Sequence, residues 1–459
     1  MYQCDGIVRP FARDEDIVIS MPPGHSRKFG QLHRAFGIAF GLAITVGGTI
    51  GVGILRRPGT IAELLPETWA IYAIWIAGGV YSLLGALCVA ELSTMTPRAG
   101  GFFVFTNRAF GPAAGFATGW CDWLSNTAAV GYAAIASAEL LARFLPRLQP
   151  SITAIAIGLA VVLAASQCRG IRSSDHIQQA LSALLCLTFL ALLIASFLHP
   201  TSPTPAVPHA SIVLGSWVLA FRAVIVSYDG WYESAYFAGE TTNPSRTLPR
   251  ALVGGVFLVT TIYLLVNASL LHVLSVQGLR GSELPAADLA RRIAGGWGDS
   301  FIVALSLLAL IPLTNACVLG GSRILYGIGR ELLGWEAATQ VNRGGSPWVA
   351  TVITAGAAVL LIASGTFDAL LGMASVFMVV VYCSAYASVI VLRQREPLAE
   401  RPFRMPLYPW IPLLLLITGV AFLAAIAKGD FRNTIAAAGA IALSYPVYLL
   451  GKRMLNGPR

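Results

Sequence analysis

The sequence predicts an all-α polytopic membrane protein with twelve transmembrane helices, and three observations lead to this fold class. Of the 459 residues, 56% are hydrophobic and 12% are charged, whereas ordinary soluble domains are roughly 25% charged. The hydrophobic residues form runs of about 20, the length that a helix needs to cross a bilayer. The basic residues lie in the short segments between these runs. These features exclude a soluble globular protein.

Twelve apolar segments follow one another without an extramembrane domain between them. They cover residues 36–56, 69–92, 112–141, 151–168, 177–198, 213–239, 249–273, 300–320, 348–364, 366–392, 409–427 and 432–451. We expect five units along the chain: an N-terminal tail over 1–35, a first five-helix unit over 36–200, a second over 213–395, two further helices over 405–452, and a C-terminal tail over 453–459.

The basic residues predict the orientation in the bilayer. When the loops are assigned to alternate sides, 21 of the 31 Lys and Arg residues fall on the side of the N-terminal tail and 9 on the other. Cytoplasmic loops carry the excess of such residues, so both termini are expected in the cytoplasm and the protein in the cytoplasmic membrane. This asymmetry accounts for the net charge of +9 without a nucleic-acid partner. The tail lacks the pattern of a cleavable signal peptide.

Two of the twelve segments break the rules for an uninterrupted helix. The first contains Gly47, Gly48, Gly51 and Gly53, and the sixth contains Asp229 in the middle of its apolar run. Each glycine costs about 1 kcal/mol relative to alanine in a helix, and a mid-membrane aspartate costs about 2.5–3.5 kcal/mol. We interpret both segments as broken helices. Close helix packing through the Gly47 and Gly51 pair is the alternative for the first segment.

The positions of the two breaks predict an inverted repeat. They lie in the first and sixth segments, so each opens a unit of five helices. Because five is odd, the second unit enters the membrane from the opposite side. Interrupted segments at matching positions of two halves indicate the central binding site of a transporter.

Broken helices expose backbone groups that suit a zwitterion. The N–H groups around 51–53 can hold a carboxylate, and the carbonyl groups near Ile44, Thr45 and 226–228 can receive an ammonium. Small residues let the ligand approach the main chain. An amino acid matches both ends. The predicted substrate-binding residues are Thr45, Thr49, Ile50, Gly51, Val52, Gly53, Val226, Ser227, Tyr228, Asp229 and Gly230.

Several motifs resemble the amino acid-polyamine-organocation superfamily, in particular its bacterial and L-type amino acid transporters. They occur in order: Gly-Val-Gly-Ile at 51–54, Glu-Leu-Ser at 91–93 with Pro-Arg-Ala-Gly-Gly at 97–101, Tyr-Asp-Gly-Trp at 228–231, Glu240 with Asn-Pro-Ser-Arg-Thr-Leu-Pro-Arg at 243–250, and Ser-Arg-Ile-Leu-Tyr at 322–326. The resemblance implies a leucine-transporter-type 5+5 fold. It also implies alternating access, in which spans 1, 2, 6 and 7 move against spans 3, 4, 8 and 9.

Two departures from the family bear on substrate and coupling. Val52 stands where the family has serine, so a hydroxyl contact to the carboxylate is lost. Some relatives carry a lysine in the fifth span in place of a sodium ion, and here Leu185 stands near that position. In span eight, Thr314 is the one hydroxyl that we identify as a possible sodium ligand.

Two further acids lie within the apolar segments. Asp122, in the third, is our candidate for proton coupling or cation recognition. A structural pair with a residue such as Arg222 is the alternative. Asp229 could accept hydrogen bonds from the backbone N–H groups that the helix break frees, or it could contact the substrate directly.

Gating residues are predicted at the cytoplasmic ends of spans two and six. Glu91 lies close in sequence to Arg98, and Glu240 lies close to Arg246 and Arg250. We expect Glu91, Glu240 and the loop with Arg246 and Arg250 to form an inner-gate polar network. Trp231 is a further gating candidate.

The function predicted is secondary transport of amino acids, as an exchanger or a proton-coupled symporter. Neutral or broad specificity is favoured because few carboxylates are placed to face the cavity, and a cationic amino acid or a polyamine is the alternative. A channel would need a lined pore. We find no pattern of catalytic, metal-ligating or cofactor-binding residues. The expected partners are the small-molecule substrate and the lipid bilayer.

Overall fold

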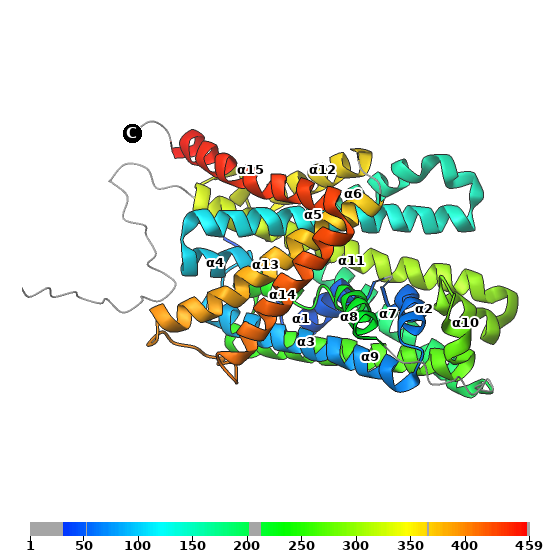
Figure 1. Ribbon diagram of the computed structural model, residues 1–459. Coiled ribbons are helices and arrows are strands. Elements are labelled where there is room, and N and C mark those ends of the chain that lie inside the picture. The colour runs from blue at the N-terminus through cyan, green and yellow to red at the C-terminus, as the bar shows by residue number, and fades with distance from the viewer. Residues whose placement is uncertain (1–30, 52, 202–212, 365–366, 457–459) are drawn as a thin grey trace, which may run out of the picture.

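The computed structural model describes residues 31–51, 53–201, 213–364 and 367–456, and these residues are mainly helical (Figure 1). Within these ranges the β structure consists of an isolated bridge between Phe36 and Thr241. Helices are expected because every backbone N–H and C=O in lipid must find a partner inside the protein. The prediction of an all-α protein is confirmed.

A helix or an interrupted pair of helices lies over each of the twelve predicted segments, and α4 and α10 lie in segments that we predicted as loops. The main helices are α1 Ile38–Thr49, α2 Gly53–Leu64, α3 Thr68–Met95, α4 Phe102–Phe110, α5 Pro112–Phe144, α6 Ile152–Gln167, α7 Ile171–Leu198, α8 Leu214–Ser227, α9 Pro244–Leu279, α10 Pro285–Ala294, α11 Gly298–Ile328, α12 Trp348–Ser364, α13 Phe367–Arg395, α14 Trp410–Gly429 and α15 Phe431–Asn456.

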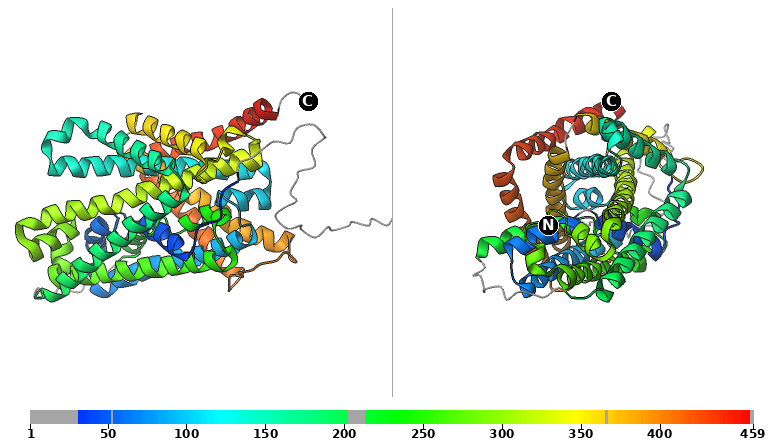
Figure 2. Two further views of the ribbon diagram at one scale, coloured as in Figure 1. Left: turned by 180° about the vertical axis from the view of Figure 1, so that it is seen from behind. Right: turned by 90° about the vertical axis from the view of Figure 1, so that its right-hand side faces the viewer.

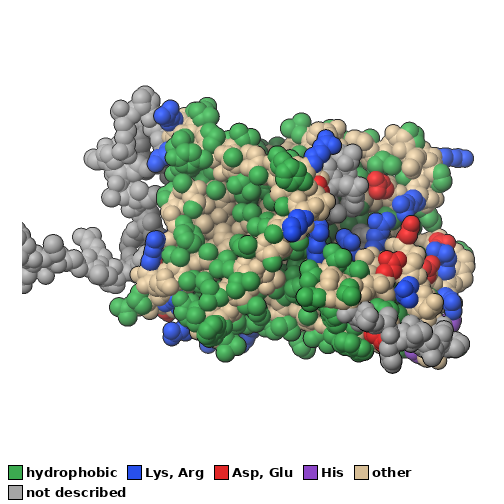
Figure 3. Space-filling model, in the orientation of Figure 1, with side chains coloured by type: hydrophobic (Ala, Val, Ile, Leu, Met, Phe, Trp, Pro, Cys, Tyr) green, Lys and Arg blue, Asp and Glu red, His purple; other side chains and the backbone are tan. Residues whose placement is uncertain are grey.

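Eight helical stretches in the described part of the chain are long and apolar enough to cross a bilayer, and the bent pair α1 and α2 adds a ninth. The helices α8 and α12 are apolar but shorter. Hydrophobic side chains cover most of the face in Figure 3, and charged side chains gather mainly at the end that carries α10. These observations support a polytopic membrane protein. Twelve crossings and the inverted repeat stay predictions.

Nine of the helices form two packed groups, and other helices, among them α13, pack around them. One group consists of α1, α2, α3, α8 and α9, in which α9 packs on both α3 and α1. The other consists of α5, α6, α11 and α12, in which α5 and α11 share an extensive contact. The helix α1 also packs on α7 and α11 and so joins the groups. Figure 2 shows the helices end-on, arranged around the interior.

Candidate functional site

Both predicted interruptions are present. The helix α1 ends at Thr49 and α2 begins at Gly53, at an angle of 49°. The helix α8 ends at Ser227, and a 3-10 helix, η2, runs over Glu233–Glu240. Between them Gly230 has a φ of +101°, a conformation that glycine adopts without a steric penalty.

The two breaks lie directly against each other. A Cβ atom on Gly230 would sit 2.3 Å from the carbonyl oxygen of Gly48, and one on Gly53 would sit 3.2 Å from the Cα of Ser227. Glycine is therefore required at Gly230, where a Cβ would overlap the facing main chain, and a side chain at Gly53 would press on Ser227.

Tyr263 on α9 joins the ends of the two broken helices. Its hydroxyl lies 2.6 Å from the carbonyl oxygen of Ser227 and 3.1 Å from that of Thr49. Carbonyl groups at a helix end lack a partner within the helix, so this hydroxyl, a single donor, is shared between them.

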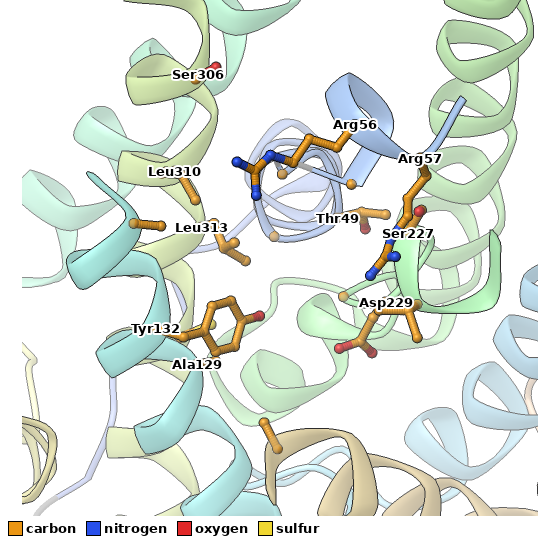
Figure 4. A pocket seen from close by; sticks show the side chains of 18 of the residues that line it. Thr49, Arg56, Arg57, Ala129, Tyr132, Ser227, Asp229, Ser306, Leu310 and Leu313 are labelled. Carbon is orange, nitrogen blue, oxygen red and sulfur yellow. The ribbon is translucent and has the colours of Figure 1, made fainter. Parts of the chain in front are cut away.

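A cavity of about 650 Å³ begins at the two breaks (Figure 4). Its volume falls within the roughly 300–1,000 Å³ of small-molecule sites. From the breaks it extends along α2, α5 and α11 to Arg143 and to Glu283 beside α10. Seven of the predicted substrate-binding residues line it: Thr49, Gly51, Gly53, Val226, Ser227, Asp229 and Gly230.

The other predicted substrate-binding residues do not line the cavity. Thr45 is buried and packs on α9, where a Cβ on Gly255 would lie 2.5 Å from its methyl carbon. Ile50 is fully buried. Tyr228 points toward α3 and donates a hydrogen bond of 3.1 Å to the carbonyl oxygen of Trp75. Val52 lies outside the described residues.

The charged gating candidates pair with residues far away in the sequence. Glu240 forms a bidentate ion pair with Arg323 on α11, at 2.9 and 3.1 Å, and both side chains are 0% exposed. Arg246 and Arg250 are exposed. Among the described residues the expected contacts between Glu240 and these two arginines do not form, because the buried carboxylate takes a buried guanidinium and the loop arginines face outward.

Glu91 also pairs with residues far away in the sequence, and within the described part of the chain it does not pair with the loop that follows α3. It accepts hydrogen bonds from Arg393 on α13, at 2.8 and 2.5 Å, and from the backbone N–H of Met405. Arg401 lies 3.3 Å from the same carboxylate. These contacts hold α3 against α13 and the segment before α14.

Asp122 and Trp231 are buried but lie outside the cavity lining. Asp122 accepts a hydrogen bond of 2.6 Å from the hydroxyl of Tyr236 on η2, and Asn126 also donates to it. The alternative pair with Arg222 does not form, because that arginine lies beside Gly429 at the end of α14.

Sequence reasoning missed several residues of the site. Glu233 is 2% exposed and lines the cavity, and an acid within the sixth apolar segment was a signal that could have identified it. Arg56 and Arg57, just after the first break, project into the cavity from α2 (Figure 4). Asp229 accepts a hydrogen bond from the hydroxyl of Tyr382 on α13.

An uncharged network supports α1 close to the first break. Asn315 on α11 donates a hydrogen bond of 2.8 Å to Gln178 on α7, and Ser182 donates one of 2.8 Å to the carbonyl oxygen of Ala43. A Cβ on Gly47 would lie 2.4 Å from the Gln178 amide nitrogen. Amide and hydroxyl groups therefore pack against α1 here.

The comparisons with known proteins agree with this architecture. The sequence model of the amino acid permease family matches residues 32–444. The serine/threonine exchanger SteT of Bacillus subtilis is 25% identical over 84% of this chain and 89% of its own length. The human b(0,+)-type amino acid transporter 1 is 27% identical over 90% and 86%, and the human cystine/glutamate transporter 27% over 86% and 80%. The chain therefore belongs to the amino acid permease family of the amino acid-polyamine-organocation superfamily.

Proposed function

We propose that this protein is a secondary transporter that exchanges amino acids across the cytoplasmic membrane by alternating access. The observation that carries the proposal is the cavity that begins at two broken helices and extends toward one end of the molecule. Its lining includes main chain from both breaks, which is the feature that a ligand with both a carboxylate and an ammonium requires.

The substrate carboxylate binds at the start of α2. The N–H groups of the first helical turn have no partner within the helix and carry the positive end of the helix dipole. Gly51 and Gly53 both line the cavity at this point, so a carboxylate can reach the main chain. The ammonium binds at the C-terminal ends of α1 and α8, where the carbonyl groups of Thr49 and Ser227 lie.

Access alternates because the two helix groups move relative to each other. Between the cavity and the far end stands a closed layer that includes the Glu240–Arg323 pair, which joins η2 to α11. Tyr236 on η2 packs edge-on against Phe102 of α4, with ring centroids 6.1 Å apart. Opening this layer while the α10 end closes would release the substrate on the other side. With cytoplasmic termini, the open end faces outward.

The uncharged network around α1 supports exchange that is not coupled to the movement of an ion. The hydroxyl of Ser182 satisfies the Ala43 carbonyl, so no cation is needed to neutralise this position. Thr314 donates its hydroxyl to the carbonyl of Leu310 in its own helix. Proton-coupled symport is the second candidate, because one oxygen of the buried Asp122 carboxylate has no hydrogen-bond partner and could hold a proton.

Uptake of labelled amino acids into proteoliposomes tests the proposal. We expect uptake that requires unlabelled amino acid inside the vesicle and ignores proton and sodium gradients. Uptake into empty vesicles that is driven by a proton gradient would favour the symporter instead. If no amino acid in a panel of all 20 is transported or bound, the assignment of the substrate class is wrong.

A pair of variants tests the carboxylate site. Gly51→Leu would place a branched side chain in the cavity, where a Cβ alone already meets Leu313 at 3.4 Å. Gly158→Leu is the matched control, because nothing lies within 4 Å of a Cβ at this position on α6. We expect the first variant to lose substrate binding and the second to retain it. Normal affinity in Gly51→Leu would disprove the carboxylate assignment.

A further inference from the structure

Glu233 is a buried acid in the lining of the cavity, and one of its carboxylate oxygens has no hydrogen-bond partner among the described residues. The side chain is 2% exposed, and the oxygen without a partner is Oε2. The main chain makes room for it, since a Cβ on Gly48 would lie 2.7 Å from the Glu233 Cγ. A buried carboxylate oxygen without a partner is costly, so the side chain is placed where a ligand can satisfy it.

A second carboxylate lies on the same side of the cavity. Asp229 lines the cavity, and Tyr382 donates a hydrogen bond to it. Within the described residues neither Asp229 nor Glu233 forms an ion pair; the buried acids that do form one are Glu91 and Glu240. Two negative charges in one buried site repel each other, and a cation bound there would offset that repulsion and favour the charged form of both acids.

The same cavity is also lined by two basic side chains. Arg56 and Arg57 project into it from α2 (Figure 4), close to the N-terminal end of that helix. A ligand that satisfies both the basic and the acidic groups therefore carries a negative group for α2 and a positive group for the acids of the second break.

We propose that the substrate is an amino acid whose side chain carries a positive charge. Its carboxylate binds at the start of α2, its α-ammonium at the carbonyl groups of the breaks, and its side-chain ammonium or guanidinium at Glu233. This proposal rests on the proposed function and makes it narrower. It replaces the expectation of a neutral substrate, which assumed that few carboxylates face the cavity and did not include Glu233.

Three ligands of similar length separate the parts of this proposal. Lysine carries the carboxylate and the side-chain cation, norleucine lacks the side-chain cation, and cadaverine lacks the carboxylate. Each competes with labelled lysine for the protein in proteoliposomes. We expect lysine to bind at least about tenfold more tightly than the other two, because a charge-assisted hydrogen bond is lost in each analogue.

The variant Glu233→Gln keeps the shape of the side chain and removes its charge. We expect it to weaken lysine binding by about tenfold or more and to leave norleucine binding unchanged. Glu233→Asp, which keeps the charge, should restore part of the preference. Glu400→Gln is the matched control, because Glu400 is exposed and distant from the cavity lining.

Five results would overturn the inference. Equal affinity of the wild-type protein for lysine and norleucine excludes a side-chain cation site without any variant. Equal weakening of both ligands in Glu233→Gln would assign the carboxylate to the α-ammonium or to folding. Cadaverine binding as tight as lysine binding would remove the carboxylate from the proposal. Transport of neutral amino acids alone would refute the cation site and leave the proposed function standing. No transport or binding of any amino acid would refute the cation site and the proposed function together.

Discussion

Glu240 and Arg323 form an ion pair from which water is completely excluded. The carboxylate on η2 and the guanidinium on α11 meet at 2.9 and 3.1 Å, and neither side chain is exposed. The guanidinium also lies 5.2 Å from the ring centroid of Phe237. This pair connects η2, which follows the second helix break, to α11 in the other group of helices.

Glu240→Gln should therefore destabilise the protein strongly. Removing one partner leaves Arg323 charged and buried, which costs about 3–5 kcal/mol. Thermal unfolding in detergent measures the effect. The double variant Glu240→Gln with Arg323→Met should recover part of the loss, and Arg246→Gln, at an exposed position, should have little effect. A larger loss in Arg246→Gln than in Glu240→Gln would restore the network expected from sequence neighbours.

Gly230→Ala should disrupt the contact between the two breaks. The residue has a φ of +101°, and its added methyl group would lie 2.3 Å from the Gly48 carbonyl oxygen. The strained backbone alone costs about 1–3 kcal/mol. We expect loss of substrate binding together with a lower unfolding temperature. Gly158→Ala provides the comparison, since its methyl group meets nothing within 4 Å; similar behaviour of the two variants would contradict the contact.

Tyr263→Phe should weaken substrate binding more than Tyr228→Phe. The first removes the hydroxyl shared by the helix-end carbonyl groups of Thr49 and Ser227, at a cost of about 1–3 kcal/mol for buried groups without partners. The second removes a hydrogen bond to the carbonyl oxygen of Trp75. Because Trp75 lies within α3, its carbonyl keeps a backbone hydrogen-bond partner in the helix. Isothermal titration with the transported amino acid compares them. The reverse order would show that Tyr228 is the aromatic residue closer to the substrate.

Asp122→Asn should leave the pH profile of exchange unchanged. An asparagine oxygen can still accept the hydrogen bond of Tyr236, so the contact between α5 and η2 persists without an ionisable group. Transport rates between pH 5 and pH 8 in proteoliposomes provide the measurement. A profile that flattens in the variant would instead identify Asp122 as a proton-coupling group. Tyr236→Phe, which removes the same hydrogen bond and keeps the acid, separates structural from coupling effects.

Local patterns were sufficient to place the helices over the twelve apolar segments and the two interruptions, but not α4 and α10. An apolar run of about 20 residues forms a helix in lipid whatever its neighbours are. The glycines at 47–53 interrupt the first run, and Asp229 with Gly230 interrupts the sixth. The break residues that line the cavity follow from this, because they are the residues with freed backbone groups. The family was also recognisable, since its motifs are short stretches of consecutive residues.

The partners of the side chains depend on contacts between distant segments. Glu240 lies next to Arg246 in sequence, yet it pairs with Arg323, which is 83 residues away. Tyr263 reaches both helix ends only because α9 packs on α1 and α8 ends beside it. Whether Tyr228 faces the cavity or α3 depends on the rotation of one short segment after α8. Such choices depend on packing and burial in three dimensions, which neither spacing nor composition records. The sequence shows Glu233 as an acid within an apolar segment, and the tertiary structure places it in the cavity lining.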